Sequence, residues 1–376
     1  MFKCSDLYQD LGVKKLINAY GTVTKIGGSL MPEEVVNAMK YASRTFVDIN
    51  ELQEKVGKRI SDLLGVESAL VTSGATSGLA VVTAACMTGN DLAKINQLPY
   101  AYNMKNEIIV HKSHRTVYDQ AIRMTGAKII EIGLAKETYS WELESAISEQ
   151  TAAAVYFAHA EKDIASIPLE EFIKVSHKKN IPVIVEAASE LPPRGNLTRF
   201  INMGADVAIF SGGKDLRGPQ ASGLVIGKSE IIKSAALNNC PNPSIGRAMK
   251  VGKEEIIGLL VALEMYLKEE LKERMQIWKS QVELIFSKIN TLKGIKVEKK
   301  VNYDIGVRPE CIPRLVVSID EQQLGISSVE VVRKLKEEEP GVVVGHLKNV
   351  LIICPQMLNK GEEEIVAARF IKIFDN

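Results

Sequence analysis

A single lysine stands between two apolar runs in the stretch IFSGGKDLRGPQASGLVIG, residues 209–227. Two glycines lie directly before Lys214, and the run Leu224–Ile226 follows the loop. An amine at the end of a sheet strand lies where open α/β sheets bind ligands. Glycines let a bulky group approach the backbone closely. A lysine placed there can bond covalently to an aldehyde. The plainer alternative is a turn lysine that faces solvent.

A second stretch, VTSGATSG, has the residue types of an anion site. It places hydroxyls and backbone N–H groups where an apolar strand breaks and a helix begins. Such a helix start suits a phosphate, although it also fits an ordinary capped helix. Ser211, three residues before the lysine, can give the phosphate a further hydroxyl. The predicted phosphate ligands are Ser73, Gly74, Ala75, Thr76 and Ser211.

Two more side chains follow predicted strands. Glu186 ends the apolar run in VIVEAASELPP, where a carboxylate is costly unless it meets a cation. His114, in VHKSHRTVYD, follows another strand, and its ring could stack on a flat cofactor or simply lie at the surface. A phosphate cradle, a stacking ring, an acid and an amine together are the partners that pyridoxal 5′-phosphate (PLP) needs. The sequence therefore predicts PLP as the cofactor.

The elements that must position these residues alternate along the chain. Strand and helix patterns succeed one another from about residue 68 to 211, which predicts a mainly parallel sheet covered by helices on both faces. Residues 1–50 are expected to form an irregular arm and a first helix, 51–252 a large PLP-binding domain, 253–292 one long connecting helix, and 293–376 a small α+β domain.

Bulk composition sets further limits. Lys and Arg number 47 and Asp and Glu 46, so nothing demands an acidic partner such as nucleic acid or anionic lipid. The five cysteines are scattered and show no C-x-x-C pair, which predicts neither a disulfide framework nor a structural zinc or other metal site. No long apolar run or apolar leader is seen, so a cytoplasmic protein without membrane partners is expected.

The motifs resemble those of fold-type-I PLP enzymes. Within them, the chain is similar to the group related to bacterial selenocysteine synthase (L-seryl-tRNA selenium transferase), and most similar to D-glucosaminate-6-phosphate ammonia-lyase-like enzymes. The resemblance is carried by INAYGTVTKIGGSLMPEEV, ELQEKVGKRI, ALVTSGATSGLA, HKSHRTVYDQAIRMTGAK, IPVIVEAASELPP, FSGGKDLRGPQASG and IGRAMKVGKEEI. It covers about residues 16–260 and implies an aspartate aminotransferase-like fold with a seven-stranded, mainly parallel sheet.

The resemblance also implies roles for the site residues. Lys214 carries the cofactor, His114 stacks on its ring, and the TSGA turn with Ser211 holds its phosphate. Glu186 pairs with the ring nitrogen, where the family usually has Asp; the longer side chain reaches the same atom if the strand or cofactor shifts slightly. Family members pair their subunits, so a homodimer or larger even-numbered assembly is expected.

The reaction implied is α,β-elimination on a 2-amino-3-hydroxy acid, such as a phosphorylated amino-sugar acid, to give a 2-keto-3-deoxy acid and ammonia. The candidate substrate-binding cations are Arg217, Arg247, Lys250, Lys253 and Arg314. Selenium transfer to seryl-tRNA stays open, although the balanced charge and the absence of the family's N-terminal extension disfavour it. Another β-eliminase, a racemase, an aldolase and a non-catalytic PLP-binding regulator also stay open.

Overall fold

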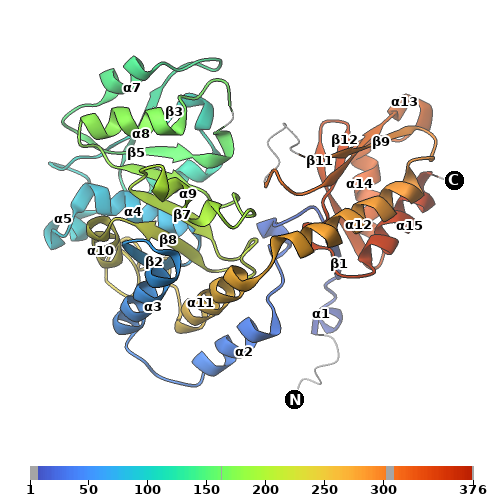
Figure 1. The fold of residues 1–376 in the computed structure, drawn as a ribbon, viewed down its shortest axis with the longest axis horizontal. Helices are drawn as coiled ribbons and strands as arrows, with labels where there is room; N and C mark the ends of the chain where they lie inside the picture. The colour runs from blue at the N-terminus through green and yellow to red at the C-terminus, as the bar shows by residue number, and fades with distance from the viewer. Residues whose placement is uncertain (1–6, 162, 302–308, 375–376) are drawn as a thin grey trace. The chain divides into compact units, whose positions relative to one another are not determined.

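The computed structural model describes residues 7–161, 163–301 and 309–374. The chain forms two compact units. The larger unit is Met31–Glu269, and the smaller unit combines Met1–Leu30 with Glu270–Asn376. Figure 1 shows the elements of each unit. This division differs from the predicted boundaries, because the N-terminal arm belongs with the C-terminal residues.

The larger unit is built on a seven-stranded sheet in the order β2-β8-β7-β6-β5-β3-β4, in which β8 alone runs antiparallel to its neighbours β2 and β7. The predicted mainly parallel, seven-stranded sheet is therefore confirmed. Its strands are β2 (Ser68–Thr72), β3 (Glu107–His111), β4 (Lys128–Ile132), β5 (Thr151–Phe157), β6 (Val183–Glu186), β7 (Val207–Ser211) and β8 (Gly223–Gly227).

Helices cover both faces of this sheet (Figure 1). The helices of the larger unit are α2 (Glu33–Ala42), α3 (Ile49–Leu64), α4 (Ala75–Thr88), α5 (Leu92–Gln97), α6 (Gln120–Arg123), α7 (Ser140–Ala146), α8 (Leu169–Lys178), α9 (Asn196–Asn202), α10 (Ser229–Asn238) and α11 (Lys253–Lys268). Successive strand residues enter different cores: Val183 and Val185 pack with α3, α8 and α11, whereas Ile184 packs with α4 and α10. This alternation follows from the two-residue period of a strand buried on both faces.

The free edge of β2 is covered by α3, which explains the motif ELQEKVGKRI. The Gln53 amide donates to the carbonyl of Val71 at 2.8 Å and accepts its N–H at 3.3 Å. One turn later, a Cβ on Gly57 would lie 2.4 Å from the carbonyl oxygen of Ala69. Residues 53 and 57 share a helix face, so α3 both hydrogen-bonds and packs closely against the edge strand that leads to the predicted phosphate turn.

The smaller unit holds a five-stranded sheet in the order β1-β11-β12-β10-β9. Its strands are β1 (Leu16–Ala19), β9 (Ile295–Lys300), β10 (Arg314–Ile319), β11 (Gly341–Leu347) and β12 (Val350–Ile353), and its helices are α1 (Leu7–Asp10), α12 (Leu271–Ile289), α13 (Glu321–Leu324), α14 (Ser328–Glu337) and α15 (Glu362–Phe374). The expected irregular arm thus contains β1, which pairs in parallel with β11. Four residues are too few to show a strand period.

The single helix predicted over 253–292 was wrong, since the structure has α11 and α12 with Glu269 and Glu270 extended between them. Within the larger unit, Arg194 Nη1 donates to the Leu267 carbonyl at 2.6 Å, and Arg217 Nη2 donates to Glu269 Oε1 at 2.8 Å. These tertiary contacts end α11 in a sequence whose helical pattern continues unbroken. Among the described residues, every helix is too short or too polar to span a bilayer.

Candidate active site at the carboxyl ends of β6 and β7

Lys214 follows β7 in a loop that folds tightly on itself. The N–H of Gly212 donates to the Ser222 carbonyl, and the N–H of Gly218 donates to the Gly212 carbonyl, both at 2.9 Å. A Cβ on Gly212 would lie 2.1 Å from Ser222 Oγ, and one on Gly213 would lie 2.6 Å from the Cα of Gln220. Both glycines are therefore required by close packing, and they fix the backbone from which the lysine emerges.

Glu186 ends β6 directly beside β7, where its Cα partner is Ile209. Burial raises the pKa of Glu186, whereas the charge of Lys214 and a hydrogen bond from Ala188 N–H oppose that rise. Burial in turn lowers the pKa of Lys214, and the charges of Glu186 and Glu190 oppose that fall. The predicted acid and amine thus lie close enough to stabilise each other's charged forms.

The carboxylate of Glu186 has unused acceptor capacity. Among the described residues, the Ala188 N–H is its one hydrogen-bond donor, at 3.1 Å from Oε1. A carboxylate has roughly four acceptor positions. A cationic ring N–H is the partner that such a group lacks, so the donor set fits the pyridinium nitrogen of PLP.

The predicted phosphate turn lies one strand away from β7. Thr72 of β2 and Ser211 of β7 both have Gly223 of β8 as their Cα partner. Two strand spacings, roughly 10 Å, therefore separate their backbones. The turn itself is packed against β8, since a Cβ on Gly223 would lie 2.4 Å from the carbonyl carbon of Gly74. The structure thus brings the turn and Ser211 to the same edge of the sheet.

The first turn of α4 is open for an anion. Its N-cap, Gly74, has φ +134° and no side chain that could cap the helix. Thr72 Oγ1 donates instead to the Gly74 carbonyl at 3.0 Å. Uncapped N–H groups at the start of a 14-residue helix suit a phosphate. Thr76 is exposed and Ala75 is buried, so of these two Thr76 is the one whose side chain is accessible.

His114 lies in a short 3-10 turn (η2, Lys112–His114) after β3, and its ring is fully buried. Its Nε2 lies 2.6 Å from Ser166 Oγ, and its Nδ1 accepts the Phe157 N–H at 3.4 Å. Burial lowers the pKa of His114 to about 2. The ring is therefore neutral and presents no exposed face in this conformation; stacking on the cofactor stays a prediction that requires the ring or its cover to move.

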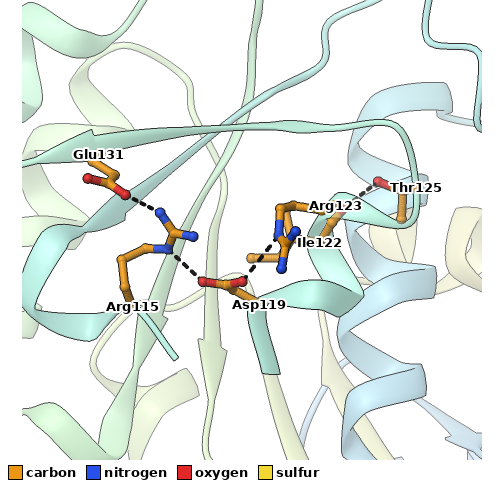
Figure 2. Close-up of polar contacts among 6 residues, drawn as sticks. All are labelled: Arg115, Asp119, Ile122, Arg123, Thr125 and Glu131. Atoms are coloured by element: carbon orange, nitrogen blue, oxygen red, sulfur yellow. Dashed lines mark hydrogen bonds and ion pairs between the residues drawn. The ribbon is translucent and has the colours of Figure 1, made fainter. Parts of the chain in front are cut away.

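The remainder of the motif HKSHRTVYDQAIRMTGAK holds this turn in place. Asp119 is buried and accepts from Arg115 Nε at 2.6 Å and from Arg123 Nε at 3.3 Å. Arg115 also pairs with Glu131 of β4, as Figure 2 shows. Two arginines and two acids therefore neutralise one another, and these motif charges serve the loop rather than a ligand.

The five candidate substrate-binding cations fall into different environments. Arg247 and Lys250 are exposed, and Lys253 pairs with Glu254. Arg217 pairs with Glu269, as described above. Arg314, in the smaller unit, is buried and donates to the carbonyls of Ile312 and Pro309 at 2.9 and 2.6 Å. Their roles toward a substrate stay predictions.

The chain is similar to known proteins in sequence and in structure. The family model of L-seryl-tRNA selenium transferase, SelA, matches residues 16–350. The chain belongs to the SelA family. The predicted cofactor, PLP, and the predicted fold-type-I architecture of this SelA-family protein are confirmed.

Two curated relatives match nearly the whole chain. The D-glucosaminate-6-phosphate ammonia lyase of Salmonella typhimurium is 31% identical over 99% of this chain and 98% of its own length. The 5′-C-glycyluridine monooxygenase-decarboxylase of a Streptomyces species is 29% identical over 96% of this chain and 90% of its own. A solved structure of D-glucosaminate-6-phosphate ammonia-lyase aligns with a TM-score of 0.85, 31% identity and 99% coverage of both chains. The predicted resemblance to ammonia-lyases is thereby confirmed.

Proposed function

We propose that this SelA-family protein is a PLP-dependent lyase that removes ammonia from a 2-amino-3-hydroxy acid, with D-glucosaminate 6-phosphate as the leading substrate. The observation that carries the proposal is full-length similarity to the ammonia lyase, in sequence and in fold, together with the Lys214–Glu186 pair at the carboxyl edge of the sheet.

The chain's own residues would divide the work. Bound PLP supplies an electron sink that acidifies the Cα–H of an attached amine. Lys214 would hold the cofactor covalently, and its Nζ would accept the Cα proton of the substrate. Glu186 keeps a positive charge on the ring nitrogen. The first turn of α4 and Ser211 bind the phosphate, and Gly212 and Gly213 keep the lysine loop rigid.

The overall reaction balances without an oxidant. The substrate loses the Cα proton and the β-hydroxyl as water, which leaves an enamine. The enamine becomes an imine, and one water hydrolyses it to a 2-keto-3-deoxy acid and ammonia. The second relative's name describes an oxygenase, so the same scaffold also hosts chemistry that needs dioxygen. Turnover without oxygen separates the two reactions.

The carboxylate and the phosphate of the proposed substrate need cationic side chains as partners. We propose Arg314 for the substrate carboxylate, since a planar guanidinium binds a carboxylate in a bidentate manner. The carboxylate would have to compete with the carbonyls of Ile312 and Pro309, which Arg314 binds within the fold. Arg217, Arg247 and Lys250 are proposed for a sugar phosphate. Arg247 and Lys250 are exposed, which supports this assignment. For Arg217, the phosphate would have to compete with Glu269.

The experiment is a panel of 2-amino-3-hydroxy acids, phosphorylated and plain, under anaerobic conditions. We expect keto acid and ammonia in equal amounts from D-glucosaminate 6-phosphate. Charged seryl-tRNA with a selenium donor is included as the family's alternative. Keto acid release from none of the panel, or turnover of the tRNA alone, would overturn the proposal.

We further propose that the protein works in the cytoplasm as a homodimer or larger even-numbered assembly. The family resemblance and the lack of a bilayer-spanning helix among the described residues support this. Sedimentation of the active protein tests the assembly, and full activity in a monomer would contradict it.

A further inference from the structure

The predicted phosphate turn follows a strand that has a helix along its outer edge. β2 is the last strand of the seven-stranded sheet, and α3 covers that edge. There the side-chain amide of Gln53 bonds both backbone groups of one strand residue: Nε2 donates to the Val71 carbonyl at 2.8 Å, and Oε1 accepts the Val71 N–H at 3.3 Å. A primary amide offers a donor and an acceptor side by side, as a neighbouring strand does. Gln53 therefore takes the place of a strand residue at the edge of the sheet.

A second amide reaches the same carbonyl. Asn239, which directly follows α10, donates from Nδ2 to the Val71 carbonyl at 3.1 Å. Its own N–H donates to the Ala236 carbonyl at 3.2 Å, and Gly246 pairs with it in an isolated β-bridge. Gln53 is 8% exposed and Asn239 is 1% exposed. Both acceptor positions of the Val71 carbonyl are thus filled by buried side chains.

The two amides act close to the phosphate turn. Val71 lies three residues before Gly74, the N-cap of α4. On the β8 side the turn is held by close packing, since a Cβ on Gly223 would lie 2.4 Å from the carbonyl carbon of Gly74. The helix is held in the same way, because a Cβ on Gly78 would lie 2.9 Å from a methyl carbon of a β8 valine. The two amides therefore fix the turn from the flank opposite β8.

The direction of the turn matters for an anion. Backbone N–H groups bind a phosphate where they point at it, so the orientation of the first turn of α4 sets its affinity for the anion. That orientation depends on the course of Thr72 and Ser73, which join Val71 to Gly74. Without Gln53 the Val71 N–H would lose its partner in a buried place, and the end of β2 would be free to shift toward another.

We propose that Gln53, supported by Asn239, positions the start of α4 for the cofactor phosphate and so makes the site specific for a phosphorylated cofactor. The proposal rests on the proposed function, in which the first turn of α4 binds that phosphate. Gln53 acts through Val71 and does not itself contact the cofactor. A residue that only stabilised the fold would affect the binding of any cofactor, phosphorylated or not.

The test compares PLP with pyridoxal, which lacks the phosphate. Full-length protein stripped of cofactor is titrated with each, and the absorbance band of the covalently bound form reports the link to Lys214. Gln53→Met keeps the length of the side chain and removes its donor and acceptor. We expect the dissociation constant for PLP to rise about tenfold, the effect of weakening one hydrogen bond to a charged group, and that for pyridoxal to stay within about twofold of wild type.

Two control variants change α3 without removing a hydrogen bond to Val71. Ser61 is as buried as Gln53, and its Oγ donates to the Lys58 carbonyl of its own helix at 2.8 Å. Ser61→Ala therefore matches the loss of a buried polar group on α3. Ile60 is fully buried, and Ile60→Val loosens the packing of the helix. Both should keep the ratio of the PLP and pyridoxal dissociation constants within about twofold of wild type.

A further variant, Asn239→Leu, removes the other donor to the Val71 carbonyl. It should raise the dissociation constant for PLP about threefold, less than Gln53→Met does, because the Gln53 amide remains. Should Gln53→Met fail to fold, Asn239→Leu decides, and an unchanged ratio of the two dissociation constants then contradicts the proposal.

The remaining outcomes separate this proposal from the proposed function. Equal losses of PLP and pyridoxal binding in Gln53→Met, or unchanged PLP binding, would overturn the role of Gln53. The same selective loss in Ser61→Ala or Ile60→Val would also overturn it, since any change in α3 would then disturb the phosphate. These titrations use no substrate. Wild-type protein that turns over no member of the substrate panel would therefore overturn the lyase proposal alone.

Discussion

Two carboxylates at opposite ends of neighbouring strands in the seven-stranded sheet differ in how many hydrogen-bond donors they have. Asp206, just before β7, is 2% exposed and accepts from Val183 N–H at 2.6 Å, His177 Nε2 at 2.7 Å and Lys228 Nζ at 2.6 Å. Glu186, at the end of β6, accepts from one described N–H, that of Ala188. Asp206 uses most of its acceptor positions within the fold, whereas Glu186 keeps most of its positions open.

This difference distinguishes an acid that stabilises the fold from an acid that is available for chemistry. A buried acid with three donors, two of them on basic side chains, is stabilised by its network and costs much to disrupt. A shielded acid with one donor has a raised pKa and gains most from a cation that binds later. We infer that Asp206 locks β6 to β7 at the amino edge, and that Glu186 keeps its capacity for the cofactor.

The largest expected effect comes from a substitution that removes the key site residue and leaves the fold intact. Lys214→Ala should lower turnover by at least about 10³-fold, since the variant loses both the attachment point and the base. The cofactor's absorbance band near 400 nm, which reports the covalent link, should vanish, whereas the melting temperature of the cofactor-free protein should stay within a few degrees of wild type. A retained band would refute the assignment of Lys214.

Glu186→Gln tests the open carboxylate. We expect kcat to fall about 10²-fold, because a neutral amide cannot hold a positive ring nitrogen. Stability of the cofactor-free protein should stay equal or rise, since a poorly paired charge has been removed. Steady-state kinetics measure the change in kcat, and chemical denaturation measures the change in stability. Glu186→Asp is the charge-conserving control. Strong destabilisation by Gln would contradict the contrast drawn with Asp206.

Asp206→Asn tests the carboxylate that has three donors. Loss of the charge leaves His177 and Lys228 without their acid, which should cost about 3 kcal/mol of unfolding free energy. Activity of the folded fraction at low temperature should stay within about twofold of wild type, because this residue lies at the edge opposite the site. Urea titrations measure the first effect and assays below the transition the second. A large loss of kcat in the folded protein would break the comparison.

The smallest effect concerns two buried histidines, His111 and His114, which have no ion-pair partner among the described residues. Burial lowers the pKa of His111 to about 4 and that of His114 to about 2, below the value near 6.5 of an unfolded histidine. The unfolded chain therefore binds more protons below pH 6.5, so stability is fully present above that pH and falls as pH drops toward 4. The slope for each histidine approaches about 1.4 kcal/mol per pH unit at pH values well below 6.5.

Denaturant titrations between pH 7 and pH 5 measure this slope. The variant His111→Asn, compared with wild type over the same range, should have an average slope smaller by about 1 kcal/mol per pH unit, because the unfolded histidine is only partly protonated near pH 6.5. An unchanged slope would mean that His111 is not neutral in the fold.

Much of the site was predictable because its residues occupy strand ends. Apolar runs followed by Ser211, Glu186 or the TSGA turn mark the carboxyl edge of a parallel sheet, where loops from neighbouring strands converge. The break between α11 and α12 was missed because Arg194 and Arg217, distant in sequence, cause it.

The sequence by itself determined the alternation of strands and helices, the lysine between its glycines, and the cofactor that such a set of side chains serves. These follow from local periodicity and from residue chemistry. Only the tertiary structure decided that His114 is enclosed, that Arg217 pairs with Glu269, and that residues 16–19 pair with a strand more than 300 residues away. Burial and charge pairing depend on neighbours that are remote in the chain, and only the folded arrangement supplies them.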